Sequence, residues 1–322
     1  MSALAVLHII FSSCIILFAL SHDEFRRDVF QRFDDYVHRY NKSYKFGTME
    51  FKRRESIFEQ TLRRVEWLNR HRNSTHAALY GINQFSDLTP EEFKNYVHLA
   101  KVNVTLKKSY PRKKNLFQSK SILEKLPKKV DWAFSTVETV ESMYALKYGS
   151  LERWSVQQVV DCAAAPNKGC EGGDTCLTIG WLYESETEIV LAEDYPFKGI
   201  TGICAKDVKS DKTVRVARNF TCDSFVGEEY LMLLHLAYHG PLIAAVDASG
   251  WQDYLGGIIQ FHCDSERNHA VQIVGYDLTG EVPYYIVRNS WGTNFGNDGY
   301  LYIAVAKNMC RIAEEVSSLD VL

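Results

Sequence analysis

The chain contains 322 residues, which is enough for one or two domains together with accessory segments. Hydrophobic residues make up 46% and charged residues 24%, an ordinary balance for a globular protein. The formal net charge of −3 gives no electrostatic reason to expect nucleic-acid binding, so we expect no nucleic-acid partner.

The N-terminus is almost continuously apolar from Ala3 to Leu20 and then turns polar. Small residues at Ala19 and Ser21 predict signal-peptide cleavage before His22, giving a signal peptide over residues 1–21. The run has no preceding Lys or Arg and approaches the length of a membrane span, so a signal anchor is the alternative. No second apolar run of that length follows. We therefore expect no membrane attachment after cleavage.

Two further features fit passage through the secretory pathway. N-x-[ST] sequons predict glycosylation at Asn41, Asn73, Asn103 and Asn219. Of the eight cysteines, Cys14 lies in the signal peptide, which leaves an odd number. In an oxidising compartment an odd number indicates a free thiol or a missing partner.

The region before residue 130 is helical and charged, and it ends in a linker. Apolar residues recur at helical spacing over residues 50–69, which predicts a long helix. Thr89 can cap a later short helix, with Pro90 at its first position and Glu92 completing a capping box. Residues 101–129 are lysine-rich without apolar periodicity, which predicts an exposed linker where processing proteases cut.

A packed domain is predicted after residue 126. Helical patterns cover residues 133–146, ended by Gly149, and residues 228–238, while Ser155 and Gln158 form a capping box that opens a helix through Val160. The period falls to two over residues 269–276, 284–288 and 300–305, which predicts strands. Helices followed by antiparallel strands indicate an α+β fold.

His269 begins one predicted strand, and Asn289 follows the next one. Adjacent antiparallel strands can bring two such ends together. An amide oxygen can then accept a ring N–H and hold the imidazole in the tautomer that proton transfer needs. A single histidine is more often structural, so it is the pairing that makes His269 and Asn289 candidate catalytic residues.

These residues occur in the order of a known family. Asn268–Val271 and Asn289–Gly292, with Asp161–Cys162 and Gly169–Gly173 upstream, resemble the motifs of papain-like cysteine proteases. The N-terminal part is similar to that family's propeptide. Residues at the spacing of its long helix, with Thr61 where Asn is usual, are Glu50, Arg54, Phe58, Val65 and Asn69. Residues that match its G-x-N-x-F-x-D motif are Gly81, Asn83, Phe85 and Asp87.

The resemblance covers about residues 25–322 and implies a precursor. It implies an inhibitory helical propeptide over residues 22–125 and a two-lobed peptidase domain over residues 126–322, with a helical lobe and an antiparallel β-barrel-like lobe. It also implies a monomer that acts on protein or peptide substrates in the lysosome or outside the cell, binds its own propeptide, and needs no metal or cofactor.

The resemblance also assigns roles in the site. His269 is the acid and base, and Asn289 orients it. Gly172 and Gly173 offer backbone hydrogen bonds to an extended substrate, and Trp291 shields the asparagine. The plainer readings are a turn for the two glycines and core packing for the tryptophan.

The nucleophile of this family is absent. Its cysteine motif precedes an Ala-Phe-Ser sequence, but here Val130–Trp132 precedes Ala133. About 20 residues are missing at this join, including the thiol and the oxyanion glutamine. Asp131 occupies the nucleophile's place, and we expect it to act only as a helix N-cap. Ser135, one turn later, has no base predicted beside it.

By resemblance, Cys162 bridges Cys204 and Cys263 bridges Cys310, while Cys170 has lost its partner with the missing segment. The pairing of Cys176 and Cys222 stays open. A lost disulfide removes about 2–5 kcal/mol of about 5–15 kcal/mol total stability, so instability of the chain is a further expectation.

We interpret the chain as an inactive version of an active protease precursor, produced by a splice variant or by an error in the reconstructed gene. The alternative is a non-catalytic homologue whose propeptide inhibits related proteases.

Overall fold

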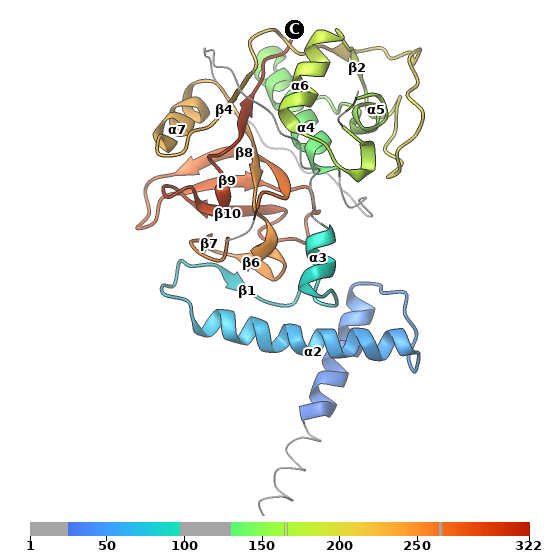
Figure 1. Cartoon of the computed structure of the whole chain (residues 1–322), viewed down its shortest axis with the longest axis vertical. Coiled ribbons are helices and arrows are strands. Elements are labelled where there is room, and N and C mark those ends of the chain that lie inside the picture. The colour runs from blue at the N-terminus through green and yellow to red at the C-terminus, as the bar shows by residue number, and fades with distance from the viewer. Residues whose placement is uncertain (1–24, 97–129, 164, 166, 264–265) are drawn as a thin grey trace, which may run out of the picture.

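The computed structural model describes residues 25–96, 130–163, 165, 167–263 and 266–322. The predicted linker and Asn103 lie outside the described residues, as does the predicted signal peptide. The described chain is α+β, with an N-terminal helical region beneath two packed lobes (Figure 1). No helix in these described ranges is long and apolar enough to cross a membrane.

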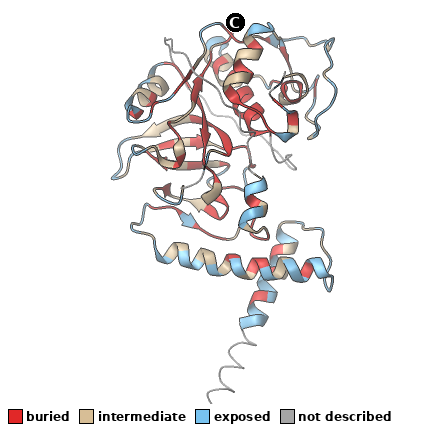
Figure 2. Cartoon of the chain, viewed as in Figure 1, coloured by how far each residue is buried: buried red, intermediate tan, exposed pale blue. Residues whose placement is uncertain are grey.

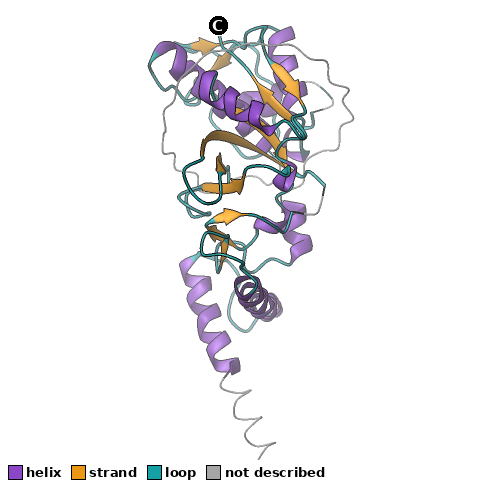
Figure 3. Cartoon of the chain, turned by 90° about the vertical axis from the view of Figure 1, so that its left-hand side faces the viewer, coloured by secondary structure: helices purple, strands orange, loops and turns teal. Residues whose placement is uncertain are grey.

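The N-terminal region has its own small core. A helix over residues 25–39 crosses helix α2 (Met49–Arg70), as Figures 1 and 3 show from two sides. Phe33, Tyr36, Phe51 and Phe58 pack at the crossing, and the outer sides of both helices are exposed (Figure 2). The long helix predicted over residues 50–69 is confirmed.

This region reaches the rest of the molecule through two short elements. Strand β1 (Leu79–Tyr80) pairs antiparallel with β6 (Tyr254–Gly256). Helix α3 (Pro90–Tyr96) begins at the predicted capping box. The Glu92 N–H donates to Thr89 Oγ1 over 3.1 Å, and the Thr89 N–H donates to Glu92 Oε2 over 3.0 Å.

One lobe is mainly helical. It contains α4 (Asp131–Tyr148), α5 (Val156–Cys162), the 3₁₀ turn η1 (Gly169–Glu171), α6 (Thr175–Glu184) and the pair β2 (Ile189–Val190) and β3 (Thr213–Val214). Ser155 caps α5 by accepting from the Gln158 N–H, as predicted. Gly149 ends α4 with a left-handed φ of 75°, a conformation that glycine adopts without strain.

The other lobe is a seven-stranded sheet in the order β4 (Thr221–Asp223), β11 (Val316–Ser318), β5 (Leu242–Val246), β8 (His269–Asp277), β9 (Tyr284–Arg288), β10 (Tyr300–Ala304) and β7 (Ile258–Ile259). Its pairs are antiparallel except for β10 with the two-residue β7. Helix α7 (Glu229–Tyr238) and the 3₁₀ turns η2 (Ser249–Trp251) and η3 (Met309–Arg311) complete this lobe. The three strands predicted from alternation are β8, β9 and β10.

The structure pairs Cys162 with Cys204 and Cys263 with Cys310. It also pairs Cys176 with Cys222, which the sequence had left open and which links α6 to the edge strand β4. Cys170 is the free cysteine of the described chain.

Helix α4 packs on β8 and β9 through buried polar groups. Glu138 Oε1 lies 3.2 Å from Arg288 Nη2, and Gln272 Nε2 donates to the Glu138 carbonyl over 3.1 Å. Glu141 accepts from the Trp154 N–H over 3.2 Å. Burial raises the pKa of Glu138, and burial together with the neighbouring Glu138 charge raises the pKa of Glu141 to about 7.

This cluster predicts a fold that is more stable in acid. The folded pKa of Glu141 exceeds its ordinary value, so its contribution is fully present below about pH 4.5 and is lost as the pH rises to about 7. We expect Glu141→Gln to remove about 1–3 kcal/mol of the difference in unfolding free energy between pH 5 and pH 7.5, measured by urea titration. The exposed Glu184→Gln is the matched control, and an unchanged pH dependence in Glu141→Gln would contradict the assignment.

Candidate active site

His269 and Asn289 lie together at one edge of the sheet. His269 opens β8 and Asn289 follows β9, and the antiparallel pairing of these strands places His269 Nε2 2.7 Å from Asn289 Oδ1. Both side chains are buried. Because Asn289 Oδ1 is an acceptor, Nε2 carries the proton and Nδ1 points to the other side of the ring.

Two tryptophans enclose the imidazole. The Trp291 ring centroid lies 4.7 Å from that of His269, and the Trp251 ring meets it edge-on at 6.0 Å. Trp291 is itself buried, in contact with Phe295. The indole therefore packs in the core against the imidazole, and its shielding of Asn289 stays a prediction.

Asp131 faces the free side of the imidazole. Its Oδ2 lies 3.2 Å from His269 Nδ1 and accepts the Ala270 N–H over 2.9 Å. The expectation that Asp131 caps α4 is wrong, because Val130 holds the cap position and Asp131 is the first helical residue. Its carboxylate points across to β8 instead and joins the two lobes.

No thiol or hydroxyl of the described residues is hydrogen-bonded to the His269 ring. Among the described residues, the polar partners of the His269 ring are Asn289 and Asp131, and the neighbours of the Cys170 thiol are Thr201 and Asp161. Ser135 is buried one turn into α4, where its hydroxyl faces the Trp132 carbonyl at 3.4 Å. The described residues also hold no group of three or more side chains suited to a metal ion.

Gly172 and Gly173 connect η1 to α6 beside the start of α4. A Cβ on Gly173 would lie 2.6 Å from the Trp132 ring, and Gly172 has a φ of 123°. Trp132 Nε1 in turn donates to the Gly169 carbonyl over 3.3 Å. The glycines therefore let this segment lie against the residue that follows Asp131.

The N-terminal region covers the site. Phe85 and Phe93 each approach the Trp291 ring edge-on at 5.5 Å, and Tyr96 lies 6.3 Å from it. Gln84 Nε2 donates to the Trp291 carbonyl over 2.9 Å. Burial, with a smaller effect of the Asp131 charge, raises the pKa of Tyr96 to about 12. The sequence did not single out Gln84 or Tyr96, because only the docked structure shows their contacts.

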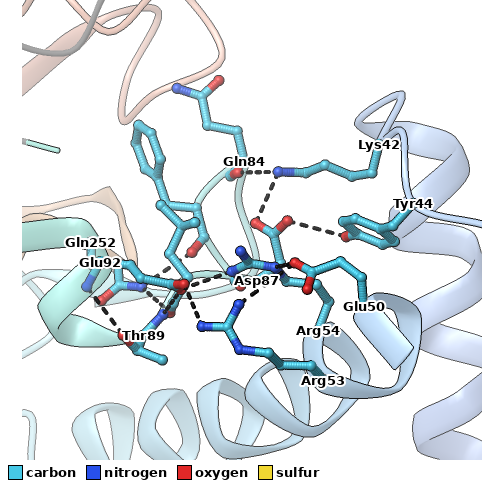
Figure 4. Close-up of polar contacts among 12 residues, drawn as sticks. Lys42, Tyr44, Glu50, Arg53, Arg54, Gln84, Asp87, Thr89, Glu92 and Gln252 are labelled. Atoms are coloured by element: carbon cyan, nitrogen blue, oxygen red, sulfur yellow. Dashed lines mark hydrogen bonds and ion pairs between the residues drawn. The ribbon is translucent and has the colours of Figure 1, made fainter. Parts of the chain in front are cut away.

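The glycine-to-aspartate motif positions this cover. The Gly81 N–H donates to the Asp253 carbonyl, and Asn83 Nδ2 donates to the Gln252 carbonyl. Asp87 accepts hydrogen bonds from three side chains of the same region, namely Tyr36, Lys42 and Tyr44. Figure 4 shows two of these bonds next to two ion pairs of Arg54, one with Glu50 within α2 and one with Glu92, which ties α2 to α3.

Comparison with protein families gives two matches in one chain. The model described as "Papain family cysteine protease" matches residues 130–319, and "Cathepsin propeptide inhibitor domain (I29)" matches residues 33–93. Cathepsin O of Homo sapiens is 41% identical over 292 residues, which cover 84% of this chain and 88% of that protein. Cathepsin O of Mus musculus is 39% identical, with coverage of 84% and 90%.

Solved precursor structures share the fold. Digestive procathepsin L 3 from Tenebrio molitor larval midgut has a TM-score of 0.77 at 26% identity, covering 91% of this chain and 99% of that one. Recombinant stem bromelain precursor has a TM-score of 0.74 at 27% identity, with the same coverage. The chain therefore belongs to the papain family of cysteine proteases and carries a cathepsin propeptide inhibitor domain ahead of its peptidase domain.

Proposed function

We propose that the chain derives from a cathepsin O-like endopeptidase precursor and that, as written, it does not cleave peptides. The observation that carries this proposal is the carboxylate of Asp131, 3.2 Å from His269 Nδ1, where the reaction requires a thiolate. Removing the nucleophile from a comparable triad lowers turnover about a millionfold, equivalent to about 8 kcal/mol of barrier.

In the active form, the thiolate would attack the scissile carbonyl and give an acyl-enzyme that water then hydrolyses. His269 would donate its proton to the leaving amine and later take one from the water, while Asn289 holds its ring. Gly172 and Gly173 would pair with the extended peptide backbone, and Trp291 would shield Asn289. The lost segment would also have supplied the glutamine for the oxyanion.

We propose maturation along the secretory route, with a signal peptide over residues 1–21, a propeptide over residues 22–125 and a monomeric peptidase domain from residue 126. Among the described sequons, Asn41, Asn73 and Asn219 are exposed, as glycosylation requires. Delivery to the lysosome or secretion fits the cathepsin relatives, and the acid-favoured Glu141 fits an acidic compartment.

Sequencing of the transcript tests whether a segment is missing at Asp131–Ala133. We expect RNA reads across these codons to contain an additional segment encoding a Cys-Gly-x-Cys-Trp sequence, because the fold around the join is otherwise that of an active protease. Reads that pass from Val130 to Ala133 without the segment, in every tissue sampled, would contradict a splice or gene-reconstruction origin.

The remaining site should accept a thiol. In the peptidase domain freed of its propeptide, we expect the thiol introduced by Asp131→Cys to react with iodoacetamide at least about tenfold faster than the thiol of Cys170, because His269 and the helix N-terminus favour the thiolate. Peptide mapping by mass spectrometry measures both rates, and Asp131→Cys combined with His269→Ala is the control. Turnover of a peptide substrate by the chain with Asp131 in place, after removal of its propeptide, would overturn the proposed inactivity.

The alternative is a non-catalytic homologue whose propeptide inhibits other cathepsins. The separate core of Phe33, Tyr36, Phe51 and Phe58 and the ring contacts on Trp291 favour its competence to bind. This alternative predicts nanomolar inhibition of an active cathepsin by residues 22–125, and Phe93→Ala should weaken it at least about tenfold. Inhibition only above micromolar concentrations would remove this alternative.

A further inference from the structure

One buried ion pair joins the propeptide to the peptidase domain. Arg64, on α2, donates from Nε to Asp253 Oδ2 over 2.6 Å and from Nη2 to Asp253 Oδ1 over 3.0 Å. Asp253 lies between η2 and β6, and its side chain is only 3% exposed. Two parallel charge-assisted bonds to a buried carboxylate form the geometry in which arginine is most selective.

The other arginine pairs of α2 are of a different kind. Arg63 and Arg70 pair within the helix, with Glu59 and Glu66, and Arg53 and Arg54 pair with Glu50 and Glu92 of the propeptide itself. A second described ion pair crosses to the peptidase domain, between His76 and Glu281, but both side chains are exposed and solvent screens such pairs.

Arg64 also makes a hydrogen bond within its own helix. Its Nη2 also donates to Thr61 Oγ1 over 3.2 Å, and Thr61 is fully buried. Thr61 is the one departure from the propeptide helix pattern noted in the sequence, and its short hydroxyl supports the guanidinium from the helix side. A pre-positioned side chain loses less conformational entropy when it binds.

The surrounding polar contacts on this loop are uncharged. The Gly81 and Asn83 bonds are made to the backbone carbonyls of Asp253 and Gln252, and Tyr80 pairs with Tyr254 through the backbone. The Gln252 side chain also takes part, since its Nε2 donates to the Phe85 carbonyl over 3.1 Å and to the Leu88 carbonyl over 2.8 Å. The Asp253 carboxylate is the charged group on this loop that a partner must supply, since the partly buried Arg64 would otherwise meet the loop without a counter-charge.

We propose that the Arg64–Asp253 pair selects the peptidase domains that this propeptide recognises. The partners it fits are papain-family domains with a carboxylate at the position of Asp253, including this chain's own domain. The inference requires only that the propeptide docks on a peptidase domain, as in the family. It does not require the missing nucleophile or the proposed inhibition of other cathepsins. The selectivity would therefore hold even if the chain proved to be active.

The test uses the full chain with a site-specific protease site inserted within residues 101–125. After cutting, isotope-labelled wild-type propeptide is allowed to distribute between wild-type and Asp253→Asn peptidase domains, and gel filtration with mass spectrometry measures its partition. We expect at least about 30-fold preference for the domain with Asp253, because one partner of a buried charge pair is lost. The Arg64→Gln propeptide should bind the two peptidase domains in amounts that differ by less than about threefold.

Arg63→Gln is the matched control, since Arg63 carries the same charge on the same helix and its described contacts, with Glu59 and the Phe25 ring, lie within the propeptide. It should keep the wild-type preference. A merely structural role of Asp253 would lower binding of both propeptides alike, and equal preference of wild-type and Arg64→Gln propeptides would overturn the proposal.

Hydrogen exchange on the intact chain provides a second measure that does not require cutting. We expect Arg64→Gln, and not Arg63→Gln, to speed exchange of the Gly81 amide at least about tenfold, because that amide donates to the Asp253 carbonyl. Unchanged exchange would also contradict the proposal.

Discussion

The contact between the start of α4 and the start of β8 is the constraint on which the site depends. Asp131 reaches across from the helical lobe to the Ala270 N–H and to the His269 ring. In an active relative, a thiolate would fill this place and be consumed and regenerated in each turnover. A carboxylate here can hold the lobes together and balance an imidazolium, but it lacks the nucleophilicity of sulfur.

Behind that contact, the same helix and strands share a second set of buried charges. Glu138, Glu141 and Arg288 place two carboxylates against one guanidinium. Because these carboxylates are buried, water solvates their excess negative charge poorly, and uptake of a proton by one of them is favoured. The packing of α4 on the sheet is therefore expected to be more stable at acidic pH, and this expectation does not depend on a nucleophile.

The propeptide meets the peptidase domain in two chemically different ways. Phe85, Phe93 and Tyr96 cover Trp291 with aromatic surface next to the His269–Asn289 pair. Arg64 meets Asp253 through directed, charged bonds at a distance along the same surface. The first contact covers the candidate site, and the second is the one that we propose distinguishes one peptidase domain from another.

Much of this molecule could be read from local patterns. The capping residues Thr89 and Ser155, the stop at Gly149 and the alternation of β8 are set by interactions within a few residues, so the sequence alone located these elements. The pairing of His269 with Asn289 followed from the ends of two adjacent predicted strands, and the family motifs supported it.

Contacts between distant segments could not be read in this way. The sequence predicted a cap from Asp131, because aspartate at a helix start normally bonds its own helix, yet here a β8 amide lies closer to its carboxylate. The Cys176–Cys222 disulfide and the Arg64–Asp253 pair join segments 46 and 189 residues apart. The sequence by itself determined the elements and showed that no cysteine stands where the family motif places one, while only tertiary packing decided which buried charges meet, because partner choice depends on distance in space.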